Sequence, residues 1–341
     1  MNVAILGAGM MGTAIATPIA DRGHAVRLVG TPLDGAQVDA MRRTGEHPGL
    51  GARLPEAVLP ELAPSVADAI GAADAIVLGV SSAGIGWAAD VLARHLSRPV
   101  PIAMVTKGLQ HDGALRILPD VLGSRLPEAV RAAPVAIGGP CIAGELARRR
   151  PSAVVFAGRD PRACRRLADA FRGPCYRVAT SDDPAGVCTS SALKNAYATA
   201  VGIGAGLHEL EGGIPGSVAM HNFEAAVFAQ ALVEMTRLAV VLGGRPETAA
   251  GLAGAGDLFV TCQGGRSSRL GRLLGLGRSL ADAQREMSTP DCPVTLEGVE
   301  IAAVVVRDLP PALAPEDLPL LHRLHAVLFE GAAPASVFEC P

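Results

Sequence analysis

Two lysine side chains are the residues in this sequence whose type points most directly to acid–base chemistry. The chain has 341 residues and 30 cationic side chains, of which 28 are arginine and two, Lys107 and Lys194, are lysine. Arginine replaces lysine well wherever a solvated positive charge is needed, but its pKa of about 12 or more prevents proton transfer near neutral pH. A lysine that arginine cannot replace is therefore a candidate acid, base or compact charge. The alternative is that both are chance remnants in an arginine-rich composition.

The surroundings of each lysine favour a functional interpretation. Lys107 directly follows the apolar run 102–105, which predicts a strand, whereas Lys194 lies in the otherwise apolar segment 191–197, which predicts a helix. A lysine in such a helix either extends to solvent or is held in a polar site. Asp257, placed after a glycine-rich stretch, is a candidate partner for it.

A phosphate-binding side chain is predicted near the middle of the second half. Arg266 follows two glycines, Gly264 and Gly265. A guanidinium and free backbone N–H groups can converge on a phosphate there.

A glycine motif at the start of the chain predicts a dinucleotide site. The β-rich run 2–6 is followed by Gly7-Ala-Gly9-Met-Met-Gly12 and then by the helical stretch 13–22. Gly7 permits a tight turn, Gly9 lets the backbone approach a pyrophosphate, and Gly12 lets helix and strand pack closely. The anion would bind at the helix N-terminus, where free N–H groups and the macrodipole favour it.

The first half predicts a mostly parallel, doubly wound α/β sheet. Further strands are expected at 25–29, 75–80, 102–105, 135–137 and 153–157, with helical segments between them. Ligands bind at the carboxyl ends of such strands, where Ser81 and Lys107 lie. The second strand ends without the acidic residue that would bind a ribose 2′-hydroxyl; Thr31 stands there and Asp34 comes slightly later. NAD and NADP are therefore both candidate cofactors, with a slight preference for NADP.

The second half predicts helices only. Amphipathic stretches at 192–205, 222–242 and 318–328 replace the strand pattern, and the length favours two domains, 1–185 and 186–341.

Composition excludes several other functions. A net charge of -3 and 3% aromatic residues argue against a nucleic-acid partner. The most apolar stretch, 187–207, contains Lys194 and Asn195 and does not predict a membrane span. Seven cysteines without a CxxC pair, and no visible signal peptide, favour reduced thiols in the cytoplasm. His322 and His325 lack acidic or cysteine companions, so no metal site is predicted.

Six segments resemble one enzyme family in content and order: GAGMMGTAIA, VTKGLQ, IGGPCIAGELA, SALKNAYATAVGIGAGL, GLAGAGDLFVTCQGGRSS and TLEGVEIA. The chain is similar to NAD(P)-dependent glycerol-3-phosphate dehydrogenases from residue 1 to about residue 330. The resemblance implies a Rossmann domain followed by an all-helical domain like that of 6-phosphogluconate dehydrogenase. It also implies reversible hydride transfer between dihydroxyacetone phosphate and sn-glycerol 3-phosphate, which supplies the glycerophospholipid backbone, in a protein that is commonly a homodimer.

The resemblance implies a role for each matching position. Lys194 corresponds to the proton donor and acceptor, with Lys107 and Asp257 beside it in catalysis. Substrate contacts are expected from Lys107, Asn195, Asp257, Thr261, Arg266 and Ser267. Cofactor contacts are expected from Gly7, Gly9, Met10, Met11, Gly12, Thr31, Ser81, Lys107, Ala143, Arg266 and Glu297.

The family chemistry explains why a lysine is needed. Hydride arriving at a carbonyl carbon builds negative charge on oxygen, which an ammonium can protonate. The reverse reaction needs the neutral amine, and we expect burial and the charge of Lys107 to lower the pKa of Lys194.

The sequence departs from the family pattern at several positions. Ser267 stands where asparagine is usual, Cys141 replaces a serine, and Cys188 replaces a glutamate. Asn222-Phe-Glu224-Ala-Ala replaces N-T-K-A-A, and about ten extra residues precede it, around 208–216.

Two other functions remain open from the sequence. A reductase of another small ketone or 2-oxo acid, similar to 2-dehydropantoate reductase, would use Arg266 to bind a carboxylate. A non-catalytic NAD(P)-binding module is the alternative of another class.

Overall fold

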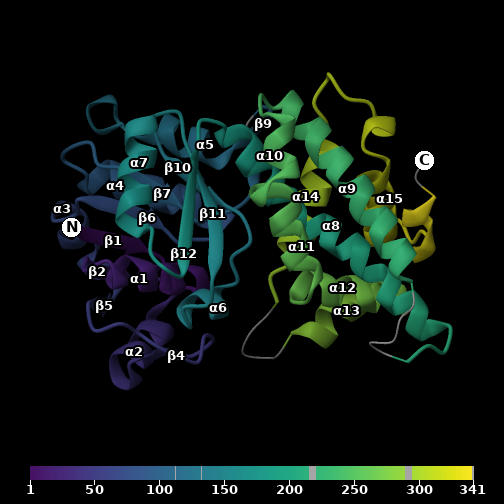
Figure 1. Cartoon of the computed structure of the whole chain (residues 1–341), viewed down its shortest axis with the longest axis horizontal. Helices are drawn as coiled ribbons and strands as arrows, with labels where there is room; N and C mark the ends of the chain where they lie inside the picture. Colours follow the sequence, from purple (N-terminus) through teal and green to yellow (C-terminus); the bar gives the residue numbers. More distant parts are fainter. Residues whose placement is uncertain (112, 132, 215–219, 289–293, 340–341) are drawn as a thin grey trace. The chain divides into compact units, whose positions relative to one another are not determined.

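The chain divides into two compact units, residues 1–107 with 117–188 and residues 108–116 with 189–341. The computed structural model describes residues 1–111, 113–131, 133–214, 220–288 and 294–339. The first unit is α/β and the second is helical (Figure 1), which confirms the predicted fold class. Residues 108–116 group with the second unit, so the chain enters the second unit at residue 108, returns to the first at residue 117 and enters the second again at residue 189.

An eight-stranded sheet forms the centre of the first unit, in the order β12-β11-β10-β7-β6-β1-β2-β5. Its strands are β1 (Asn2–Leu6), β2 (Ala25–Val29), β5 (Val58–Glu61), β6 (Ala75–Leu78), β7 (Ile102–Met104), β10 (Val135–Gly138), β11 (Ser152–Ala157) and β12 (Tyr176–Ser181). Every neighbouring pair is parallel except β10 with β11. The six strands from β5 to β10 follow the strand order of dinucleotide-binding sheets, with the reversal at β1 and β6.

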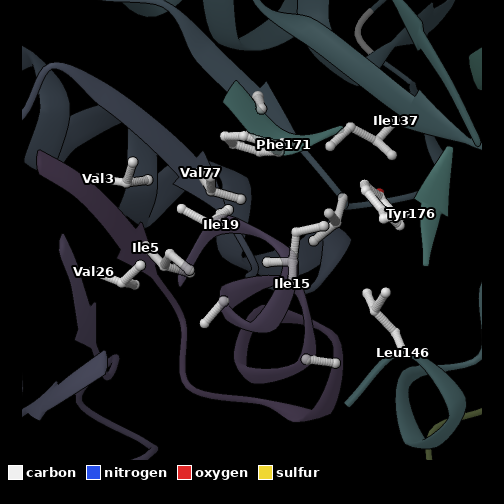
Figure 2. Packing of buried hydrophobic residues seen from close by; sticks show 14 of the residues in the cluster. Val3, Ile5, Ile15, Ile19, Val26, Val77, Ile137, Leu146, Phe171 and Tyr176 are labelled. Carbon is white, nitrogen blue, oxygen red and sulfur yellow. The ribbon is translucent and has the colours of Figure 1, made fainter. Parts of the chain in front are cut away.

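Helices cover both faces of this sheet, and its central strands β1, β6, β7 and β10 bury side chains on both sides. They are α1 (Met10–Asp21), α2 (Gly35–Thr44), α3 (Val66–Gly71), α4 (Ile85–His95), α5 (Leu118–Arg125), α6 (Ala143–Ala147) and α7 (Pro161–Phe171). Val3 and Ile5 of β1 pack in one cluster with Ile15 of α1 and Phe171 of α7 (Figure 2). Ala4 and Leu6 face the opposite cluster, which contains α3, α4 and α5. This alternation is the period of two expected of a strand.

The second unit is helical apart from a short hairpin, β8 (Leu109–His111) with β9 (Leu115–Ile117), whose last residue groups with the first unit. Its helices are α8 (Pro184–Leu210), α9 (His221–Val241), α10 (Pro246–Ala250), α11 (Asp257–Cys262), α12 (Arg266–Gly275), α13 (Leu280–Met287), α14 (Glu297–Arg307) and α15 (Pro319–Phe329). Helix α8 begins in the first unit and continues into the second. Within the described ranges no strand follows Ser181, and none of the described helices is long and apolar enough to cross a membrane.

Glycines bring α8 and α12 into direct backbone contact. A methyl group on Gly202 of α8 would lie 2.6 Å from the carbonyl oxygen of Ser268, and one on Gly206 would overlap the carbonyl of Arg272. From the α12 side, Gly271 and Gly275 lie equally close to the backbone of α8. This glycine contact fixes α12, which begins at Arg266, on the helix that carries Lys194.

A buried carboxylate joins three helices of the second unit. Glu234 of α9 is fully buried and accepts hydrogen bonds from the Tyr197 hydroxyl of α8 (3.0 Å) and from Gln230 (2.9 Å). It also accepts from the backbone N–H groups of Leu320 (2.6 Å) and Leu321 (3.0 Å) in the first turn of α15. Glu234 therefore satisfies donors that a helix N-terminus cannot satisfy within itself. Tyr197 lies one turn after Lys194, so the same network holds the lysine-bearing part of α8.

Candidate active site

The glycine loop after β1 has the geometry that a bound pyrophosphate requires. Gly7 has φ +105°, which side chains rarely adopt, and a Cβ there would lie 2.8 Å from the backbone of Gly79. Gly9 precedes α1 in extended conformation, and a Cβ there would meet nothing within 4 Å. The loop is thus packed against the sheet at Gly7 and open at Gly9, where the N-terminus of α1 begins. These residues fit a dinucleotide phosphate.

Other predicted cofactor residues follow the ends of parallel strands in the same unit. Thr31 follows β2, Ser81 follows β6, and Lys107 follows β7. Because these strands are parallel, their carboxyl ends lie at one edge of the sheet. Thr106 links two of these loops, since its hydroxyl donates to the carbonyl of Val80 at 2.8 Å.

The remaining cofactor residues predicted in this unit lie on two helices that pack together. Met10 and Met11 begin α1, with Met10 about half exposed, and Gly12 is buried against the loop. Ala143 begins α6, and α6 packs against α1.

In the second unit, Lys194 is held by the carboxylate proposed from the sequence. Its Nζ donates to Oδ1 of Asp257 in an ion pair whose two side chains are 11% and 1% exposed. Asp257 is the first residue of α11 and follows a short π-helical turn, η4 (Leu252–Gly256). Water is largely excluded from this pair, and the carboxylate fixes the direction of the lysine side chain.

A second polar pair lies next to the first on α8. Asn195 donates from Nδ2 to Oε2 of Glu297 at 3.0 Å, and Glu297 is the first residue of α14. A Cβ on the following Gly298 would lie 2.7 Å from the backbone of Asn195, so the start of α14 is in close contact with α8. Two acidic residues, each beginning a helix, therefore meet consecutive residues of α8.

The predicted phosphate side chain lies at the start of α12. Arg266 is exposed, begins the helix after two glycines with positive φ, and donates from Nη1 to the carbonyl of Thr295 at 3.2 Å. Ser267 follows it and is partly buried.

Thr261 of α11 does not turn its hydroxyl outward. It donates to the carbonyl of Asp257 at 2.6 Å, one turn earlier in the helix. The hydroxyl thus contacts the backbone of the residue that holds Lys194.

Two polar residues that contact Ala8 of the glycine loop, Asp34 and His47, were not linked to each other by the sequence. Asp34 accepts hydrogen bonds on one oxygen from the N–H of Thr31 (2.7 Å) and of Ala8 (3.1 Å). His47 contacts the carbonyl of the same Ala8 at 3.2 Å. The partners are 26 and 39 residues apart, so no local pattern could indicate them; Asp34 was noted only as coming late after its strand.

Two cysteines, Cys188 and Cys262, do not have the properties of nucleophiles. Burial raises the pKa of the Cys262 thiol to about 12 and raises that of Cys188 far above its ordinary value. Both are protonated at neutral pH, and a thiol must ionise to attack. Cys292, Cys340 and residues 215–216 of the extra segment lie outside the described residues. In the described ranges, no group of three or more histidine, cysteine or acidic side chains could hold a metal ion.

The sheet order and the glycine loop define a Rossmann domain of the dinucleotide-binding class, and a helical unit follows it. Comparison with known proteins agrees. A model of the NAD-dependent glycerol-3-phosphate dehydrogenase N-terminus matches residues 2–164, and a model of the C-terminus of the same enzymes matches residues 183–339. The chain belongs to the NAD-dependent glycerol-3-phosphate dehydrogenase family.

Individual relatives cover nearly the full length of the chain. The NADP(+)-dependent glycerol-3-phosphate dehydrogenase of Archaeoglobus fulgidus is 34% identical over 97% of this chain and 96% of its own. The glycerol-3-phosphate dehydrogenase [NAD(P)+] of Xanthomonas campestris pv. campestris is 36% identical over 98% and 92%. The crystal structure of the Coxiella burnetii glycerol-3-phosphate dehydrogenase aligns with a TM-score of 0.80, at 28% identity, over 99% of this chain and 97% of that one.

Proposed function

We propose that this protein catalyses the reversible conversion of dihydroxyacetone phosphate to sn-glycerol 3-phosphate with NAD(P) as cofactor. The observation that carries this is the nearly buried Lys194–Asp257 pair in a chain that belongs to this family. When bound, the nicotinamide supplies or accepts the hydride.

Lys194 is proposed as the acid and base at the substrate's C2 oxygen. In reduction its ammonium gives one proton to the oxygen on which negative charge develops, and in oxidation the neutral amine takes that proton back. Asp257 orients the ammonium and keeps it charged until the oxygen needs the proton. Arginine could provide the charge but not the proton.

Lys107 is proposed as a fixed positive charge that binds substrate and cofactor. Lys107 follows the end of β7, at the same edge of the sheet as Ser81, and this position supports the role.

The phosphate of the substrate is proposed to bind at the start of α12. The guanidinium of Arg266 and the N–H groups of the first helical turn offer donors suited to a phosphate. Asn195 and Ser267 are proposed to contact the substrate, and Thr261 to act through its contact with Asp257. Glu297 is proposed as a cofactor contact, with its present partner Asn195 fixing its carboxylate.

The chain uses NAD(P), and we propose that it accepts both forms. The expected slight preference for NADP stays a prediction. The position of Asp34 argues against a preference for NADP. The carboxylate of Asp34 lies beside the glycine loop and accepts hydrogen bonds from Thr31 and Ala8. A carboxylate there can accept a ribose hydroxyl but repels a 2′-phosphate.

Replacing Asp34 with asparagine tests this point. The amide oxygen can still accept from Thr31 and Ala8, but the negative charge is gone. We expect kcat/KM with NADPH to rise relative to that with NADH by about tenfold. Asp39→Asn, the same change at an exposed position of α2, serves as the control. An unchanged ratio in Asp34→Asn would remove Asp34 from cofactor selection.

A substrate assay tests the proposed reaction itself. We expect rapid oxidation of NADH or NADPH with dihydroxyacetone phosphate and little with 2-dehydropantoate, measured by absorbance of the reduced nicotinamide. The reverse preference would assign Arg266 to a carboxylate and the chain to the related reductase activity. Tight binding of NAD(P)H with no turnover of either ketone would favour a non-catalytic module.

We also propose a homodimer in the cytoplasm. Family membership supports the dimer, and the cysteine pattern supports a reducing compartment. Light scattering on the purified protein and fractionation of cells test the two proposals separately.

A further inference from the structure

Both backbone groups of Ala8, between the first two glycines of the loop, are held by side chains. Its N–H donates to Asp34 at 3.1 Å. Its carbonyl accepts from the imidazole of His47 at 3.2 Å and from the hydroxyl of Thr13 at 3.3 Å. Ala8 is fully buried and His47 is 4% exposed, so water does not replace these partners.

The hydrogen bonds define the tautomer of His47. The backbone N–H of Gly49 donates to Nδ1 at 3.0 Å, so Nδ1 carries no proton. The ring proton is therefore on Nε2, which donates it to the Ala8 carbonyl. The imidazole is neutral and both of its nitrogens are used. Burial also lowers the pKa of His47, which agrees with a neutral ring.

His47 itself is held by a small hairpin. It lies on β3 (Glu46–His47), which pairs with β4 (Ala52–Arg53). Arg148, directly after α6, donates from Nη2 to the carbonyls of Leu50 (2.9 Å) and Gly51 (3.3 Å) in the turn between these strands. The hairpin is thus fixed to the helix that packs on α1, and the ring is held in place from outside the loop.

We propose that His47 is a positioning residue for the cofactor. Rotation of the peptide planes around Ala8 would turn the N–H groups at the start of α1 away from the pyrophosphate. His47 and Asp34 prevent this by holding the carbonyl and the N–H of the same residue. His47 has no contact with the reacting atoms in this role. The inference rests on the use of NAD(P) but not on the identity of the ketone.

Direct titration of NADH and NADPH, without any ketone, tests the proposal. His47→Phe keeps a ring but removes both hydrogen bonds, and we expect Kd for the cofactor to rise about tenfold or more because the Ala8 carbonyl loses a buried donor. kcat at saturating cofactor and KM for the ketone should stay within about twofold. His47→Gln offers one donor and one acceptor and should restore part of the affinity. Glu46→Gln, on the exposed neighbour, is the matched control.

Thr13→Val provides a second test should His47→Phe fail to fold. It removes only the other donor to the Ala8 carbonyl, and a rise in cofactor Kd of about threefold is expected. Unchanged Kd in a folded His47→Phe or in Thr13→Val would overturn the proposal. So would an affinity loss that His47→Gln does not reduce. If wild type binds neither reduced nucleotide, the proposed function fails instead.

Discussion

Replacing Lys194 with arginine is expected to lower kcat by about 10² to 10⁴ while cofactor affinity stays unchanged. Arginine keeps the positive charge and can still pair with Asp257, so the developing oxyanion is still stabilised. It cannot transfer a proton near neutral pH. Steady-state kinetics with dihydroxyacetone phosphate, together with a cofactor titration, separates the two effects.

The other lysine provides the matched control for this experiment. Lys107→Arg makes the same chemical change at a position whose proposed role is charge rather than proton transfer. We expect a clearly smaller loss of kcat than at Lys194. A Lys194→Arg enzyme with near wild-type kcat would contradict the proton-transfer role, as would equal losses at the two positions.

Replacing Glu234 with leucine is expected to destabilise the protein by about 3 kcal/mol or more. The change leaves two N–H groups of α15 buried without the acceptor that Glu234 provides, and it removes one hydrogen bond of the Tyr197 hydroxyl. Each buried N–H group without an acceptor costs about 1–3 kcal/mol. Chemical denaturation measures the loss. Glu234→Gln keeps an acceptor oxygen and should lose less. Equal stability of wild type and Glu234→Leu would show that the network does not contribute.

The pH dependence of the same pair of proteins gives an independent check. Burial raises the pKa of Glu234 above its ordinary value of 4.5, despite four hydrogen bonds that oppose the shift. A raised pKa in the folded state contributes stability below about pH 4.5, and this contribution is lost as pH rises through the folded pKa. The stability advantage of wild type over Glu234→Gln should therefore decrease as the pH rises from 4.5.

The sequence predicted those parts of the molecule that depend on neighbouring residues. Gly7, Gly9 and Gly12 lie between a strand and a helix. Their spacing alone indicates a tight turn, an open approach to the backbone and close packing of the helix on the strand. The alternation of strands and helices likewise led to the sheet, although β5 and β12 were not predicted. β5 is short and contains Pro60, and β12 is an edge strand with several exposed residues.

Contacts between distant residues were harder to predict. Asp257 was a candidate partner for Lys194 because it follows a glycine-rich stretch, and Lys194 lies in an otherwise apolar segment. His47 and Glu234 gave no such signal: a single histidine in a turn-rich segment and a glutamate in a helix are ordinary by type. Their importance comes from partners 39 and 86 residues away along the chain, Ala8 and Leu320.

The glycine contact between α8 and α12 limits how this protein can be engineered. Alanine is preferred to glycine within helices by about 1 kcal/mol, so helical glycines are common first targets for raising thermostability. At Gly202, Gly206, Gly271 and Gly275 the opposite applies, because any side chain would push the two helices apart. A thermostable variant has to obtain its gain elsewhere, since widening this contact would move the start of α12 away from the helix that carries Lys194.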